Sequence, residues 1–174
     1  MSAKYSNQRY TARKLTEADI PVLREAIGGD GQPHRLKPGG RSYHPENCLM
    51  VVEEAGKIIG SVYVIFVRPP RWPDADDTSQ LPQINRFVVK EAHRNQGAGT
   101  YLMGAVEEEV KSRGLTRLYL GVDHESGSAL RLYKRLGFEI ISTEPYRTSW
   151  SYTDSNGVEQ EEVEWLVDMV KKLS

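Results

Sequence analysis

The sequence predicts an α/β fold in which helices pack on a sheet. Two segments, residues 97–113 and 126–136, carry apolar residues at helical spacing, and each is followed by a glycine, Gly114 or Gly137. Short runs rich in β-branched and aromatic residues come before, between and after these segments. Strands that alternate with helices bury their apolar faces when the helices cover the sheet.

The composition is that of a folded, soluble protein, and 174 residues predict a single domain over residues 1–174. The balance of 23 basic against 24 acidic residues disfavours nucleic-acid binding through simple charge. A single cysteine, Cys48, allows no internal disulfide, and the histidines show no ligand spacing, so we expect a cytoplasmic protein without a metal. No apolar run approaches the ~20 residues of a membrane span, and the first 13 residues lack a signal-peptide core.

The first half of the chain predicts one short helix and two strands. Residues 17–27 carry a start signal at Asp19 and end before a glycine pair, as a short helix does. Residues 30–46 have no apolar period and predict a loop or lid. Residues 49–54 and 57–67 are β-rich runs separated by two residues, which predicts a hairpin.

The second half alternates strands and helices. Residues 83–89, 115–122 and 138–141 predict strands that flank the two helices. The C-terminal segment around residues 163–170 fits both a strand and a helix, although Asn156-Gly157 before it resembles a hairpin turn.

Residues 88–100 carry the sharpest motif, because they place two glycines between a strand and a long helix. Small residues at a helix N-terminus let exposed amides approach an anion such as a pyrophosphate, and Arg94 adds a full positive charge. A nucleotide-triphosphatase loop is excluded because no lysine follows Gly99. A dinucleotide fingerprint is disfavoured because Leu102 stands where a third glycine is needed, although Asp123 would suit the ribose.

The pattern Arg94-x-x-Gly97-x-Gly99 resembles the signature of the GNAT superfamily of acyl-CoA-dependent N-acyltransferases. A second segment, Tyr133-x-x-x-Gly137-Phe138, is similar to the helix-to-strand segment of that superfamily. The resemblance implies a three-layer α/β fold with a mixed, splayed sheet flanked by helices and the cofactor's pantetheine arm in the gap. It also favours a strand for the C-terminal segment.

The resemblance implies acetyl-CoA as co-substrate. Backbone groups of the strand would bind its pantetheine arm, and amides of the loop would hold its pyrophosphate, so backbone matters there more than side chains. The cofactor-binding residues implied are Phe87, Val88, Val89, Arg94, Asn95, Gln96, Gly97, Ala98, Gly99, Thr100 and Ser126. Ser126 stands where relatives often carry an asparagine, and it equally suits the N-cap of the next helix.

The resemblance gives Tyr133 the role of general acid toward the departing thiolate, although a core position on the helix also suits it. The general base is not found where relatives place it, because those positions hold Gln83 and Gly121. His124 is a candidate base, and a water chain through Gln83 and Asn85 is an alternative.

The implied reaction moves the acetyl group to a primary amine of a small molecule or protein by direct attack in a ternary complex, and a homodimer is possible. The loops give conflicting indications about the acceptor. Asp74, Asp76 and Asp77, with the aromatic residues Trp72, Tyr146, Trp150 and Tyr152, favour a cation, whereas Arg35, Lys37 and Arg41 favour a carboxylate. An alternative function is a non-catalytic acyl-CoA-binding sensor or interaction module, which the two missing bases would suit.

Overall fold

A computed structural model describes residues 5–28, 43–67, 81–142, 144–153 and 156–174. The chain forms two compact units. The first comprises residues 1–118 with 173–174, and the second comprises residues 119–172. The single domain expected over residues 1–174 stays a prediction.

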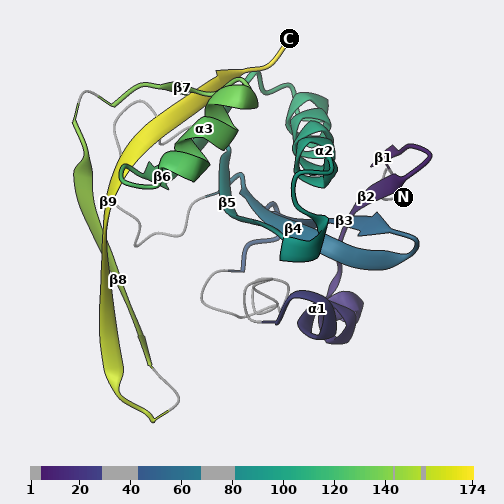
Figure 1. Cartoon of the computed structure of the whole chain (residues 1–174), viewed down its shortest axis with the longest axis horizontal. Coiled ribbons are helices and arrows are strands. Elements are labelled where there is room, and N and C mark those ends of the chain that lie inside the picture. Colours follow the sequence, from purple (N-terminus) through teal and green to yellow (C-terminus); the bar gives the residue numbers. More distant parts are fainter. Residues whose placement is uncertain (1–4, 29–42, 68–80, 143, 154–155) are drawn as a thin grey trace. The chain divides into compact units, whose positions relative to one another are not determined.

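The strands of the first unit form an antiparallel sheet in chain order (Figure 1). They are β1 (Tyr5–Ser6), β2 (Tyr10–Lys14), β3 (Cys48–Glu54), β4 (Lys57–Ile65) and β5 (Gln83–Val89). The predicted hairpin between β3 and β4 is confirmed, and its two turn residues, Ala55 and Gly56, have φ angles of 49° and 76°. Positive φ at both positions matches the twist of a two-residue hairpin.

Two α-helices cover opposite faces of this sheet (Figure 1). The 3-10 turn η1 (Glu17–Asp19) leads into α1 (Ile20–Ile27), which buries Leu23 against the side chains of β3 and β4. The 3-10 turn η5 (Glu91–His93) precedes α2 (Ala98–Ser112), which packs on β2, β3 and β4. Both faces of β3 are buried as a result, which explains its unbroken apolar run.

Polar contacts fix the C-terminal half of α2 to this unit. Glu109 accepts from Lys14 at 2.6 Å and from Arg113 at 2.9 Å, and the Arg113 guanidinium lies 3.6 Å from the ring centre of Phe66.

Cys48, at the start of β3, is a free thiol. Burial is the main cause that raises its pKa to about 12, and the nearby Glu109 carboxylate is the second. The thiol is therefore neutral at physiological pH and packs as an apolar group.

The second unit contains the remaining elements. They are β6 (Arg117–Asp123), whose first two residues belong to the first unit, α3 (Gly127–Arg135), β7 (Glu139–Ile140), β8 (Tyr146–Thr153) and β9 (Glu159–Lys172). β7 and β8 pair antiparallel with β9, and β6 neighbours β9 in the sheet. The C-terminal segment is therefore a strand, as the resemblance implied. Hydrogen bonding to strands on both sides decides what the period alone left open.

Helix α3 ends at the predicted glycine. Gly137 has a φ of 92°, and the Phe138 N–H donates to the Tyr133 carbonyl at 2.9 Å, which closes the helix in a Schellman motif. Helices and sheets in this order confirm the α/β fold class predicted from the sequence. Within the described residues, no helix is long and apolar enough to cross a membrane.

Candidate functional site

The loop between β5 and α2 builds an anion site from backbone groups. Gly97 is the N-cap of α2 with a φ of 91°, and Asn95 has a φ of 58°. The first amide that bonds within the helix is that of Tyr101, which donates to the Gly97 carbonyl at 2.9 Å. The N–H groups of Ala98, Gly99 and Thr100 therefore have no acceptor within the helix and carry its positive dipole end.

The two glycines of the motif serve the loop differently. Gly97 needs its left-handed conformation, which a side chain would strain, although a Cβ there would meet no atom within 4 Å. A Cβ on Gly99 would lie 3.5 Å from the Phe87 ring and 3.7 Å from a Val89 methyl, which is ordinary contact. Gly99 is therefore not required by packing, and its missing side chain leaves the neighbouring amides open.

Residues near the N-terminus fasten this loop. Tyr10 donates its phenol hydrogen to the Gln96 carbonyl at 2.8 Å, and Arg9 donates to the Gln96 side-chain oxygen at 2.6 Å. The Gln96 amide donates in turn to the Ala92 carbonyl at 2.9 Å. The Gln96 side chain therefore holds the loop together, a role that the sequence did not indicate.

Glu54, at the end of β3, also ties the loop to the sheet. Its carboxylate accepts from Arg9 at 2.6 Å and from His93 Nδ1 at 2.9 Å. The hydrogen bond from Arg9 is the main cause that lowers the pKa of Glu54. Arg94 is exposed, and its Nε donates to the Val89 carbonyl at 2.9 Å, so its charge stands beside the end of β5.

β5 contains a bulge that includes the first of the residues implied for the pantetheine arm, Phe87. Between two paired positions, β4 has Val62 whereas β5 has both Arg86 and Phe87, and Arg86 has a φ of 51°. The extra residue breaks the ladder locally and leaves backbone groups of β5 outside it. A Cβ on Gly60 would lie 2.8 Å from the Val88 carbonyl, so the glycine in β4 allows the strands to approach here.

The second unit contains the proposed acid. Tyr133 is half-buried on α3, with its ring edge-on to Phe138 at a centroid distance of 5.8 Å and an angle of 73°. Burial raises the pKa of Tyr133 to about 12. The phenol is therefore protonated at neutral pH and can donate a hydrogen bond.

The other two residues predicted in the second unit flank the start of α3. His124 is half-buried, and its backbone N–H donates to the Trp165 carbonyl at 3.0 Å. No hydrogen bond joins its imidazole to another residue in the described ranges. Ser126 occupies the N-cap position of α3, but its side chain makes no capping hydrogen bond. The alternative that its hydroxyl serves only to cap the helix is therefore not supported.

Beside Gly121 lies a polar cluster that the sequence did not reveal. Tyr119 and Tyr146 both donate to Oδ1 of Asp168, at 2.8 Å and 2.6 Å. A Cβ on Gly121 would lie 3.4 Å from the Tyr146 hydroxyl oxygen. Burial, and then the hydrogen bond to Asp168, raise the pKa of Tyr146 far above its usual range. Of the three clustered side chains, only that of Tyr146 was singled out in the sequence, as an aromatic wall for the acceptor.

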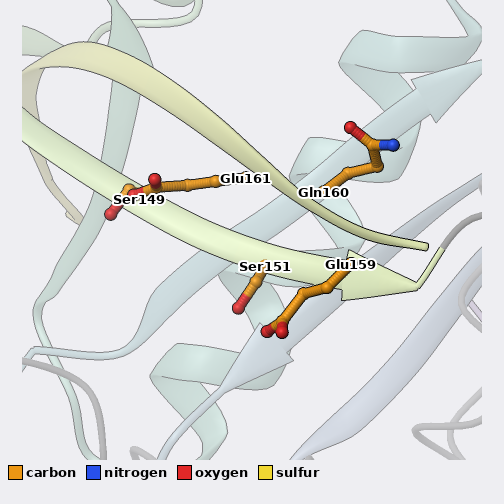
Figure 2. A pocket seen from close by; sticks show the side chains of 5 residues that line it. All are labelled: Ser149, Ser151, Glu159, Gln160 and Glu161. Atoms are coloured by element: carbon orange, nitrogen blue, oxygen red, sulfur yellow. The ribbon is translucent and has the colours of Figure 1, made fainter.

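Several expected acceptor residues lie outside the described residues, namely Arg35, Lys37, Arg41, Trp72, Asp74, Asp76 and Asp77. Trp150 and Tyr152 belong to β8. A surface pocket on the β8–β9 hairpin contains none of the predicted site residues, and Figure 2 shows the side chains that line it. They are Ser149, Ser151, Glu159, Gln160 and Glu161. The described residues hold no group of three His, Cys, Asp or Glu side chains that could bind a metal.

Solved structures of several acetyltransferases share this fold. A GNAT family acetyltransferase from Elizabethkingia anophelis with acetyl-CoA bound has a TM-score of 0.60 and 20% identity, covering 96% of this chain and 100% of its own. The ribosomal-protein-S18-alanine N-acetyltransferase of Escherichia coli has a TM-score of 0.59 and 19% identity, covering 95% of this chain and 94% of its own. At these identities the likeness shows the fold alone.

Curated relatives match parts of the chain. An uncharacterized N-acetyltransferase of Methanocaldococcus jannaschii is 29% identical over 141 residues, which is 75% of this chain and 61% of the relative. The uncharacterized N-acetyltransferase YobR of Bacillus subtilis is 39% identical over 64 residues, 37% of this chain and 26% of the relative. The chain thus spans less than two thirds of the length of either relative. The model of the acetyltransferase (GNAT) family matches residues 17–138, which include the loop before α2 and the end of α3. The chain belongs to the GNAT acetyltransferase family.

Proposed function

We propose that the protein is an N-acetyltransferase that moves the acetyl group of acetyl-CoA to a primary amine, by direct attack of the amine in a ternary complex. The observation that carries this proposal is the loop before α2, where the amides of Ala98, Gly99 and Thr100 have no acceptor within the helix. Family membership and the likeness to a structure with acetyl-CoA bound support the same reaction.

The loop fits the pyrophosphate of CoA in charge and in shape. Asn95 and Gly97 turn the backbone through left-handed conformations, and no atom lies within 4 Å of the position that a Gly97 Cβ would take. An anion there would meet the amides of the first turn and the exposed charge of Arg94. The backbone of Phe87, in the bulge, and of Val88 and Val89, which follow it, would bind the pantetheine arm.

Tyr133 is the proposed donor to the departing thiolate. A phenol with a pKa near 12 and a thiol near 8.5 differ by about 3.5 units, so complete proton transfer would cost about 5 kcal/mol. Donation of a hydrogen bond, with the final proton coming from the attacking amine, avoids this cost. The half-buried position of the side chain shields that hydrogen bond from water.

The acceptor must lose protons before and during the attack. An alkyl amine with a pKa of about 10.4 costs about 4–5 kcal/mol to deprotonate at neutral pH. Gln83 and Gly121 have no basic side chain, so His124, which is half-buried beyond the end of β6, is the candidate base. Ser126, at the start of α3, is the remaining candidate for a cofactor contact.

The test is release of free thiol from acetyl-CoA across a panel of polyamines, aminoglycosides, amino acids and lysine or N-terminal peptides. It compares the wild type with Tyr133→Phe, and Tyr43→Phe serves as the matched control because no hydrogen bond of its phenol lies within the described residues. We expect turnover on one amine class and a large loss in Tyr133→Phe alone. Tight binding of acetyl-CoA without turnover would instead identify a non-catalytic acyl-CoA-binding module.

A further inference from the structure

Asp168 is a half-buried carboxylate that forms no ion pair with a cationic side chain of the described residues. Both phenols that contact it, Tyr119 from β6 and Tyr146 from β8, donate to the same oxygen, Oδ1. Oδ2 makes no hydrogen bond, and no Lys, Arg or His side chain forms an ion pair with Asp168, anywhere in the described ranges. Carboxylates removed from water are normally paired with a cation, so this arrangement suits one that comes from outside the chain.

These side chains share one face of the second unit. Tyr146 lies opposite Leu166 in the β8–β9 register, and Asp168 follows Leu166 by two residues, so all three point to the same side. On β6, Tyr119 and Gly121 likewise share a face, and a Gly121 Cβ would lie 3.2 Å from a Leu166 methyl. The glycine therefore leaves room for the Leu166 side chain on this face.

The polar atoms of this cluster match an ammonium group. Both phenols donate to the carboxyl group, which fits its ionised form, because an ionised carboxylate only accepts hydrogen bonds. An ammonium carries three N–H donors, and Oδ2 of Asp168 and the hydroxyl oxygens of Tyr119 and Tyr146 can supply three acceptors. The Ser142 hydroxyl accepts from the Asp168 backbone N–H at 2.6 Å and holds the strand in place.

We propose that Asp168, together with Tyr119 and Tyr146, binds a cationic group of the acceptor substrate, and that this group is not the nitrogen that is acetylated. The proposal rests on the proposed function. A carboxylate stabilises the protonated form of a bound amine, whereas the attacking nitrogen must be neutral. The acceptor therefore carries a cationic group in addition to the amine that is acetylated, as a diamine, a polyamine or a basic peptide does.

The charge of the same hairpin favours such a substrate. β9 begins with a strongly acidic stretch of exposed or half-buried side chains, and two of them line the pocket in Figure 2. The acidic residues are Glu159, Glu161, Glu162 and Glu164. Arg147 lies 3.7 Å from Glu161. A negative field along the strand raises the local concentration of a polycation.

The test compares 1,4-diaminobutane with 1-aminobutane as acceptors, since the two share one reactive amine and differ in the second. The variants are Asp168→Asn and Tyr146→Phe, with Glu139→Gln as a control that removes an exposed carboxylate from β7 in the same unit. We expect the wild type to prefer the diamine at least tenfold in kcat/KM. Asp168→Asn should raise the KM for the diamine at least tenfold and change the values for the monoamine less than twofold. Tyr146→Phe should also raise the KM for the diamine, by a smaller factor than Asp168→Asn does.

A KM for the diamine that Asp168→Asn leaves unchanged, or an equal effect on both amines, would overturn the proposal. Calorimetric titration of 1,4-diaminobutane without acetyl-CoA tests the cation site independently of the proposed acetyl transfer. Binding that Asp168→Asn weakens at least tenfold supports the cation site even in a protein that transfers no acetyl group. Thermal unfolding shows whether Asp168→Asn folds. If it does not, the KM of Tyr146→Phe for the diamine, compared with that for the monoamine, tests the cation site.

Discussion

The phenol of Tyr10 donates a hydrogen bond of 2.8 Å to the backbone carbonyl of Gln96, a residue 86 positions later in the chain. The first residue of β2 thereby holds the loop whose amides face the proposed pyrophosphate site. Arg9 reinforces the same loop through the Gln96 side chain. β2 therefore supports the proposed cofactor site, although it carries no residue of the family motif.

Replacing Tyr10 by phenylalanine should weaken cofactor binding without affecting the chemistry. Loss of one hydrogen bond of about 1 kcal/mol is expected to raise the KM for acetyl-CoA about fivefold, with kcat changed less than twofold. Steady-state kinetics with a saturating amine measures both constants, and Tyr43→Phe is the matched control. An unchanged KM in Tyr10→Phe would show that the loop keeps its shape without this bond.

The two glycines of the motif should respond differently to alanine. Gly97 has a φ of 91°, so Gly97→Ala should lower the free energy of unfolding by about 1–2 kcal/mol. Gly99→Ala adds a methyl group at ordinary contact distance from Phe87 and should cost less than half as much. Urea unfolding of the two variants measures the difference. Equal destabilisation would contradict the assignment of backbone strain to Gly97 alone.

The raised pKa of Tyr133 predicts how activity depends on pH. Because this pKa is about 12, the phenol stays protonated up to about pH 10, and its contribution to the rate should be constant over that range. Tyr133→Phe should lower kcat by about 10²–10³, a loss typical for removing one hydrogen-bond donor to developing negative charge. The ratio of wild-type to variant kcat should remain the same from pH 7 to pH 10. A ratio that falls above pH 9 would mean that Tyr133 ionises near its ordinary value.

Burial of Cys48 predicts a loss of stability in alkaline solution. The thiol ionises at about pH 8.5 in the unfolded chain and at about pH 12 in the folded protein. Its contribution to stability is complete below about pH 8.5 and is lost as the pH rises toward 12, because the unfolded chain then releases the proton more readily. The free energy of unfolding of Cys48→Ala should therefore fall less steeply between pH 8.5 and pH 11 than that of the wild type. Parallel curves would indicate that Cys48 ionises normally in the folded protein.

Patterns confined to one segment predicted much of the fold. The strand over residues 83–89 was located with the same bounds as β5, and the hairpin at Ala55-Gly56 was identified from its turn residues. β2 was not predicted, because its sequence, Tyr-Thr-Ala-Arg-Lys, has little apolar character of its own. Pairing with β3 and cover from α2 make it a strand, and both come from distant segments.

Local sequence patterns likewise predicted one part of the candidate site and missed the parts that depend on distant segments. A local pattern of glycines predicted the loop before α2, because spacing alone places exposed amides at a helix start. The bulge at Arg86 and the bond from Tyr10 to Gln96 could not be predicted, because each depends on which strand lies alongside. Asp168 was also missed, since it meets Tyr119 and Tyr146 only when three strands come together.

The central claim is that the amides of the loop before α2 hold the pyrophosphate of acetyl-CoA. Calorimetric titration with acetyl-CoA and with S-acetylpantetheine, which ends before the pyrophosphate, tests it most directly. Two or more charge-assisted hydrogen bonds are worth about 3 kcal/mol or more together, so acetyl-CoA should bind about a hundredfold more tightly. Equal affinity for the two ligands would contradict the claim, because the loop would then contribute nothing to binding.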